Sequence, residues 1–258
     1  MKKHLSTFAL AARGSFWRVL AVTLSAALLC AALLWLAPGQ SREVVGHDAA
    51  GEPILQTGGI LSASVMVQKS FCCLPVMAGF ALVLWLLSRT GTGRGVQPGY
   101  TALRLRLAPW RIAVLWTLYD LVMLLFYRAA VTAAVYGVIG WRLRETGPQA
   151  LWLASYTTPL LHNLLPLRDP LGWSAMGAVT LLSAVSCALF PLRRWRGGSG
   201  TPVITAIVFT EASLWMPVSF ASSGGVGLRV ALTVIAGIIA VLTIYLSFDG
   251  EEEAHETV

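Results

Sequence analysis

The sequence predicts an all-α integral membrane protein with about six transmembrane helices. Hydrophobic residues make up 56% of its 258 residues and charged residues only 12%, about half the charged share of an ordinary soluble domain. Several apolar runs reach about 18–25 residues, the length of helix that crosses a hydrocarbon core of about 30 Å. The runs do not alternate over about ten residues as the strands of an outer-membrane barrel do, which excludes that class.

The apolar runs predict a single transmembrane domain that covers residues 1–258. The expected spans are residues 19–36, 71–87, 112–140, 172–192, 203–220 and 230–248. Pro75 in the second span and Pro217 in the fifth are expected to kink or break their helices. We interpret the first span as retained rather than as a signal peptide, because Arg13 and Arg18 delay it and no small-residue cleavage site follows.

The basic residues predict that both ends of the chain are cytoplasmic. Twelve of the 19 Lys and Arg residues fall in segments on the same side as the N-terminus, six fall on the opposite side, and Arg128 lies inside the third span. Cytoplasmic segments carry the excess of basic residues in membrane proteins. The net charge of +7 is therefore explained by membrane orientation, and no nucleic-acid partner is expected.

The segments outside the spans are short. The outside loop at 38–70 is rich in glycine, proline and polar residues, which favours a loop or small hairpin over a domain. Pro159 and Pro166 interrupt residues 141–171, which predicts a broken pair of short interfacial helices. Residues 5–16 have apolar positions three and four apart, as in a helix that lies in the inner membrane interface, although a charged end without function fits equally well. The acidic tail at 249–258 is expected to be cytoplasmic.

No motif for catalysis, cofactor binding or metal binding is expected in this chain. The glycine-rich stretch at 91–95 lacks the Lys and the Ser or Thr of a phosphate-binding loop. The four histidines are scattered and form no HExxH pair. We therefore predict that the protein is not an enzyme. The four cysteines, Cys30, Cys72, Cys73 and Cys187, form no CxxC pair and are interpreted as packing residues.

Three charged residues inside the expected spans form the candidate intramembrane polar site: Asp120, Arg128 and Glu211. Charged side chains in hydrocarbon are costly and often mark function. Asp120 and Arg128 are separated by about 12 Å along one helix and cannot pair directly. The three side chains either line a substrate path or fix packing, with Glu211 paired to Arg128, Tyr119 or Tyr127. Snorkelling of Arg128 to the outer interface is a further alternative.

Small residues recur at four-residue spacing, which allows helix backbones to approach closely. The series are Ala27 and Ala31 in the first span, Ala129, Ala133 and Gly137 in the third, and Ala236 and Ala240 in the sixth. They predict a helical bundle and leave dimerisation open.

The cytoplasmic loop at 89–111 ends in a leucine-rich basic stretch directly before the third span. Its notable residues are Thr101, Leu103, Arg104, Leu105, Arg106, Leu107, Pro109 and Trp110. An ordinary positive-inside loop is the simpler interpretation. However, the loop, the amphipathic N-terminal segment and the six spans with both ends inside together resemble the membrane subunits of ABC-2 type ABC transporters.

The resemblance implies a permease subunit in a bacterial plasma membrane. It implies that a separate ATPase subunit binds ATP and Mg²⁺, that these eight loop residues couple to it, and that the permease works as a homodimer or heterodimer. The short connection between spans five and six and the long segment before span four depart from that family. Two alternatives stay open: a membrane anchor or assembly protein that binds a partner, and a secondary transporter driven by protons through Asp120 or Glu211. The absence of a visible inverted repeat disfavours the secondary transporter.

Overall fold

The structure is that of a polytopic helical membrane protein with one added β-hairpin. The computed structural model describes residues 2–38, 40–47, 53–60, 63–89, 109–144, 148–195, 201–214 and 223–248. The elements are α1 (Lys2–Leu36), β1 (Gln40–His47), β2 (Pro53–Ile60), α2 (Ala63–Ser70), α3 (Cys73–Ser88), α5 (Pro109–Arg142), α6 (Pro148–Thr157), α7 (Pro159–Leu164), α8 (Pro170–Trp195), α9 (Thr201–Leu214) and α10 (Ser223–Phe248). The strands pair antiparallel, so of the loop or small hairpin expected at 38–70 the structure has the hairpin.

Four helices in the described part of the chain are long and apolar enough to cross a membrane. They are Gly14–Leu36, Trp110–Arg142, Pro170–Pro191 and Gly227–Tyr245, which correspond to the first, third, fourth and sixth expected spans. The second expected span is instead the second half of a bent helix pair, α2 and α3. Of the fifth expected span the structure describes only the part in α9, whose 14 residues rise about 21 Å. Pro217 and the rest of 215–222 lie outside the described residues.

The kink expected at Pro75 occurs earlier in the chain. The axes of α2 and α3 differ by 61°, and the break between the two helices contains Phe71, which has a φ of 53°. Pro75 itself lies in the first turn of α3, where the backbone N–H groups have no partner within the helix, so a proline is tolerated there. The prediction of a kink at Pro75 was therefore wrong in its position.

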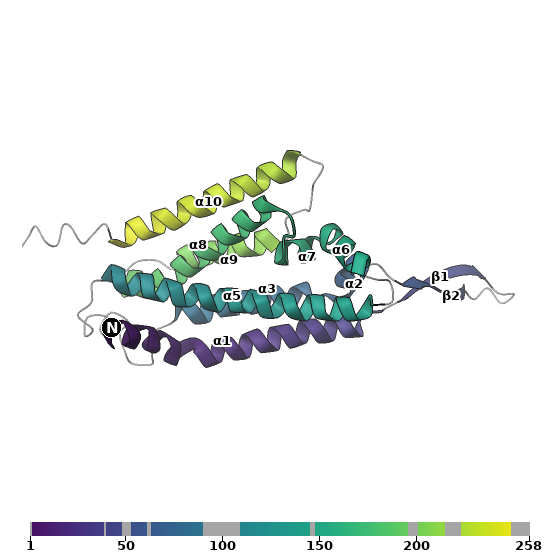
Figure 1. Ribbon diagram of the computed structural model, residues 1–258, viewed down its shortest axis with the longest axis horizontal. Helices are drawn as coiled ribbons and strands as arrows, with labels where there is room; N and C mark the ends of the chain where they lie inside the picture. The colour runs from purple at the N-terminus through teal and green to yellow at the C-terminus, as the bar shows by residue number, and fades with distance from the viewer. Residues whose placement is uncertain are drawn as a thin grey trace, which may run out of the picture.

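The long helices form one bundle with distinct ends (Figure 1). Helices α1 and α5 lie side by side, α3 packs on α1, α8 packs on α5, and α9 and α10 pack on α8. The hairpin projects from the end where α2, α6 and α7 gather, and the N-terminus and the C-terminal end of α10 lie at the other end. We call the end of the bundle that carries the hairpin, α2, α6 and α7 the hairpin end. There, Arg142 donates hydrogen bonds to the carbonyls of Ala37, at 2.6 Å, and Trp35, and so fixes the end of α5 to the end of α1.

Two apolar cores and a small third cluster of Ala113, Val185 and Leu189 hold the described helices together. The larger joins α1, α3, α5 and α8 and includes the fully buried Trp116 and Tyr127. The smaller joins α8, α9 and α10 through Ala175, Val179, Leu182, Ala206, Leu232, Ala236 and Ala240. Cys30, Cys72 and Cys187 are buried without disulfides, as expected of packing residues.

The small residues behave differently on different helices. Ala236 and Ala240 lie in the core between α10 and α8, as predicted for close helix packing. Ala129, Ala133 and Gly137 of α5 are exposed, and a side chain added at Gly137 would meet no atom within 4 Å. The close approach expected of this series is therefore not made to any described helix.

Candidate functional site

The predicted ATPase-coupling segment falls almost entirely outside the described residues. Thr101, Leu103, Arg104, Leu105, Arg106 and Leu107 are not among them. Pro109 begins α5, and Trp110 is exposed in the first turn with the Arg111 guanidinium 5.2 Å from its ring. The segment is thus connected directly to the helix that carries Asp120 and Arg128.

The three charged residues expected inside spans lie in the bundle, and none forms an ion pair with another described residue. Asp120 is 1% exposed and Arg128 is 7% exposed, both on α5. Both carboxylate oxygens of Asp120, Nη1 of Arg128 and Oε2 of Glu211 are shielded from solvent and have no hydrogen-bond partner among the described residues. No ion pair among the described residues therefore accounts for the position of these three charged side chains.

The tyrosines expected to contact Glu211 bind elsewhere. The Tyr119 hydroxyl shares a hydrogen bond of 3.0 Å with Ser15 of α1, and the Tyr127 hydroxyl donates to the carbonyl of Val76 at 2.6 Å. The structural ion pair proposed from the sequence is thus not formed within the described part of the chain. A buried charge without a partner is costly, and no described ion pair offsets that cost for Asp120 or Arg128.

A second polar cluster, centred on Asp169, lies at the hairpin end. Asp169 precedes α8 and receives an ion pair from Arg229 of α10. Its Oδ2 lies 3.1 Å from Nε2 of His162 in α7, and its Oδ1 accepts the backbone N–H of Gly172 at 3.0 Å. Nη2 of Arg229 also donates to Oδ1 of Asn163 at 3.5 Å. One carboxylate therefore joins α7, α8 and α10, and we refer to these five residues as the Asp169 cluster.

Sequence reasoning missed this cluster. His162 appeared as a scattered histidine and Arg229 as a loop charge. One local signal was available: Asp169 directly precedes Pro170, an acidic residue followed by proline, which is typical of the start of a helix. The partners from α7 and α10 become apparent only in the folded chain.

Gly172 is required by the geometry of the Asp169 cluster. A Cβ at this position would lie 2.7 Å from Oδ2 of Asp169 and 2.7 Å from Cβ of Pro166. We expect Gly172→Ala to destabilise the protein by about 1–2 kcal/mol, because the carboxylate must leave its position between His162 and Arg229. Thermal unfolding in mild detergent measures the change. Gly177→Ala, where the added Cβ meets nothing within 4 Å, is the control and should not reduce stability.

His162 should make stability depend on pH. Burial, and then the positive charge of Arg229, lower the pKa of His162 from its ordinary value of 6.5. Below about pH 6.5 His162 is protonated more readily in the unfolded chain than in the folded chain. The free energy of unfolding therefore decreases as the pH is lowered through this range. We expect unfolding temperatures at pH 7.5 and 5.5 to differ less in His162→Gln than in the unchanged protein. Equal differences in the two proteins would contradict this assignment.

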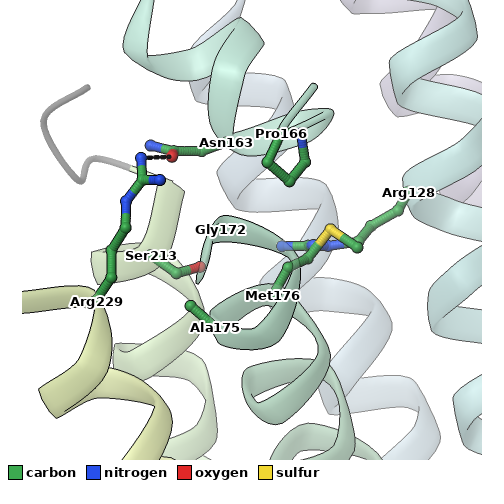
Figure 2. A pocket seen from close by; sticks show the side chains of 8 residues that line it. All are labelled: Arg128, Asn163, Pro166, Gly172, Ala175, Met176, Ser213 and Arg229. Carbon is green, nitrogen blue, oxygen red and sulfur yellow. Dashed lines mark hydrogen bonds between the residues drawn. The ribbon is translucent and has the colours of Figure 1, made fainter. Parts of the chain in front are cut away.

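A small pocket joins the two polar regions (Figure 2). It is lined by Arg128, Asn163, Pro166, Gly172, Ala175, Met176, Ser213 and Arg229, and its volume is about 20 Å³, enough for about one water molecule. Arg229 and Asn163 lie on one side, and the Arg128 guanidinium enters from the other, beside Met176. The pocket thus brings together two guanidinium groups from helices that are about 100 residues apart in the sequence.

No protein-family model, curated protein or solved structure matches the chain. Within the described residues, no three His, Cys, Asp or Glu side chains gather into a group that could hold a metal ion.

Proposed function

We propose that the chain is the membrane-spanning permease subunit of an ABC-type exporter, in which a separate subunit hydrolyses ATP. The observation that carries this proposal is the burial of Asp120 and Arg128, with the half-buried Glu211, without ion pairs among the described residues. Such groups reduce the stability of a helical bundle in a membrane. A transporter retains them because they face water and the solute when the bundle opens.

The proposed topology has six spans with both ends in the cytoplasm of a bacterial cell. The bent pair of α2 and α3 serves as the second span, and α9 with the residues that follow it serves as the fifth. The placement of the N-terminus and the C-terminal end of α10 at one end of the bundle supports an even number of crossings. Residues 5–16 would lie along the inner interface before the first span.

The proposed coupling runs through α5. ATP and Mg²⁺ bind to the partner ATPase, and this chain binds neither. Closure of two ATPases presses on residues 103–110 of each of two permease copies. Because α5 is a single helix of 34 residues from Pro109 to Arg142, a displacement at its first turn shifts Asp120 and Arg128 together. The bundle then moves between inward-open and outward-open states.

The test is purification of the protein in mild detergent, identification of the copurifying proteins and measurement of ATP hydrolysis. We expect an ATPase to copurify and its activity to be lost in Leu103→Glu and Arg104→Glu. Arg94→Glu makes the same charge change earlier in the loop and serves as the control. A folded protein that never brings down an ATPase, in gentle detergents and after cross-linking in membranes, would overturn the proposal and favour the membrane anchor.

A second candidate is a secondary transporter driven by protons, favoured by Asp120. Both oxygens of this carboxylate are buried and without a hydrogen-bond partner in the described part of the chain, an environment typical of proton-carrying groups in transporters. Such a carrier takes up protons in vesicles that contain this chain alone. Asp120→Asn should abolish the uptake, and Asp120→Glu should preserve it. Proton uptake that is absent from such vesicles, or unchanged in Asp120→Asn, excludes this candidate.

A further inference from the structure

The pocket between Arg128 and Arg229 lies where the membrane meets water. The apolar spans of α8 and α10 begin at Pro170 and Gly227, and the pocket is lined by residues within a few positions of both. The apolar stretch of α5 has 33 residues, about 50 Å of helix against about 30 Å of hydrocarbon. Part of α5 therefore extends past the hydrocarbon, and Arg128 lines the same pocket as Gly172 and Arg229, which places its guanidinium near the boundary.

The charges in the pocket do not balance. Arg229 is neutralised by Asp169, but Arg128 forms no ion pair with any described residue, and its Nη1 has no hydrogen-bond partner there. Glu211 is close in sequence to Ser213 but pairs with neither arginine within the described residues. The guanidinium of Arg128, which is only 7% exposed, therefore points into the pocket (Figure 2). Its positive charge has no ion-pair partner among the described residues.

The side chains that line the pocket favour one class of ligand. A guanidinium presents a planar fork of donors that matches phosphate or carboxylate oxygens. Arg229 and the Asn163 amide lie across the pocket from Arg128. The present volume of about 20 Å³ holds a water but not a phosphate, so the pocket must widen. Met176, a flexible side chain beside Arg128, is positioned to move aside.

We propose that this pocket binds one phosphate group at the hairpin end of the membrane, with Arg128 as its main ligand and Arg229 as the second. The phosphate belongs to the headgroup of an anionic lipid or is free phosphate. Phosphate binding in this pocket requires neither transport nor an ATPase, so its test is independent of the test of the proposed function.

Binding is tested with two probes on the full-length protein in a phosphate-free detergent. Phosphatidylglycerol is compared by native mass spectrometry with a diacylglycerol of the same acyl chains, which lacks only the headgroup. Sodium phosphate is compared with sodium chloride at equal ionic strength by thermal unfolding. Binding of phosphatidylglycerol alone identifies a lipid headgroup as the ligand. Stabilisation by sodium phosphate as well identifies a site that also accepts the free ion.

The variants separate binding from folding. We expect Arg128→Gln to weaken binding at least about tenfold, Arg128→Lys to weaken it less, and Arg144→Gln, at an exposed arginine outside the pocket, to leave it unchanged. Without added probe, Arg128→Gln should be as stable as the unchanged protein or more stable, because it removes a buried charge that has no partner. Loss of stability in Arg128→Gln without probe would assign Arg128 a structural role. That loss of stability would overturn the proposal. So would equal binding of the probes by Arg128→Gln and the unchanged protein, or binding of neither phosphatidylglycerol nor phosphate by the unchanged protein.

Discussion

Asp169→Ala is expected to destabilise the protein by about 3–5 kcal/mol, the cost of removing one partner from a buried ion pair. The substitution leaves the buried Arg229 guanidinium without its counter-charge and removes the acceptor of the Gly172 N–H at the start of α8. It also removes the carboxylate partner of His162, so α7, α8 and α10 lose their common contact. Thermal unfolding of the purified protein in mild detergent measures the effect.

Two further variants separate charge from hydrogen bonding at this position. Asp169→Asn keeps an oxygen for the Gly172 N–H and loses the charge that faces Arg229, so it should recover only part of the stability. Adding Arg229→Gln to Asp169→Ala removes the unpaired charge. The double variant should therefore lose less unfolding free energy than the sum of the losses in the two single variants. Additive costs would show that Asp169 and Arg229 do not act as a pair.

Gly79→Ala is expected to cost about 3 kcal/mol, at the upper end of the usual range for overpacking. A Cβ at Gly79 in α3 would lie 2.5 Å from the Tyr127 hydroxyl of α5 and 2.8 Å from Cβ of Ala26 in α1. The Tyr127 hydroxyl is held by the Val76 carbonyl, and Ala26 is part of the core. Three helices would have to separate to admit one methyl group.

Gly237→Ala in α10 is the matched control, because its added Cβ meets no atom within 4 Å. Replacing glycine by alanine inside a helix normally stabilises by about 0.5–1 kcal/mol, so this variant should unfold at the same temperature or higher. If Gly79→Ala behaved like Gly237→Ala in thermal unfolding, the close crossing of α1, α3 and α5 at Gly79 would be refuted.

Local features of the fold were predictable from the sequence. The four spanning helices follow from the length of the apolar runs, because a helix is the element that satisfies its own backbone groups in lipid. Pro159 marked the start of α7, and the glycine-rich segment at 38–70 contains the hairpin. The same reasoning misplaced the bend near Pro75, since a proline breaks a helix only beyond its first turn.

Contacts between distant segments were not predictable. The sequence suggested that Glu211 pairs with Arg128 because both lie inside expected spans, but spacing along the chain does not give the relative rotation of α5 and α9. Asp169 and Arg229 are separated in the sequence by all of α8 and all of α9. Their ion pair depends on the packing of α10 on α8, which only the folded chain displays.

The measurement that tests the central claim most directly is labelling of single cysteines by a water-soluble, membrane-impermeant thiol reagent. Asp120→Cys and Arg128→Cys are made in a chain without its four native cysteines. Leu118→Cys and Val122→Cys on the exposed face of the same helix are the controls. If the buried charges line a transport path, the reagent labels positions 120 and 128 during the transport cycle, and positions 118 and 122, which face lipid, stay unlabelled. Positions 120 and 128 that stay unlabelled in every state, in a protein that remains folded, would contradict a path through this bundle.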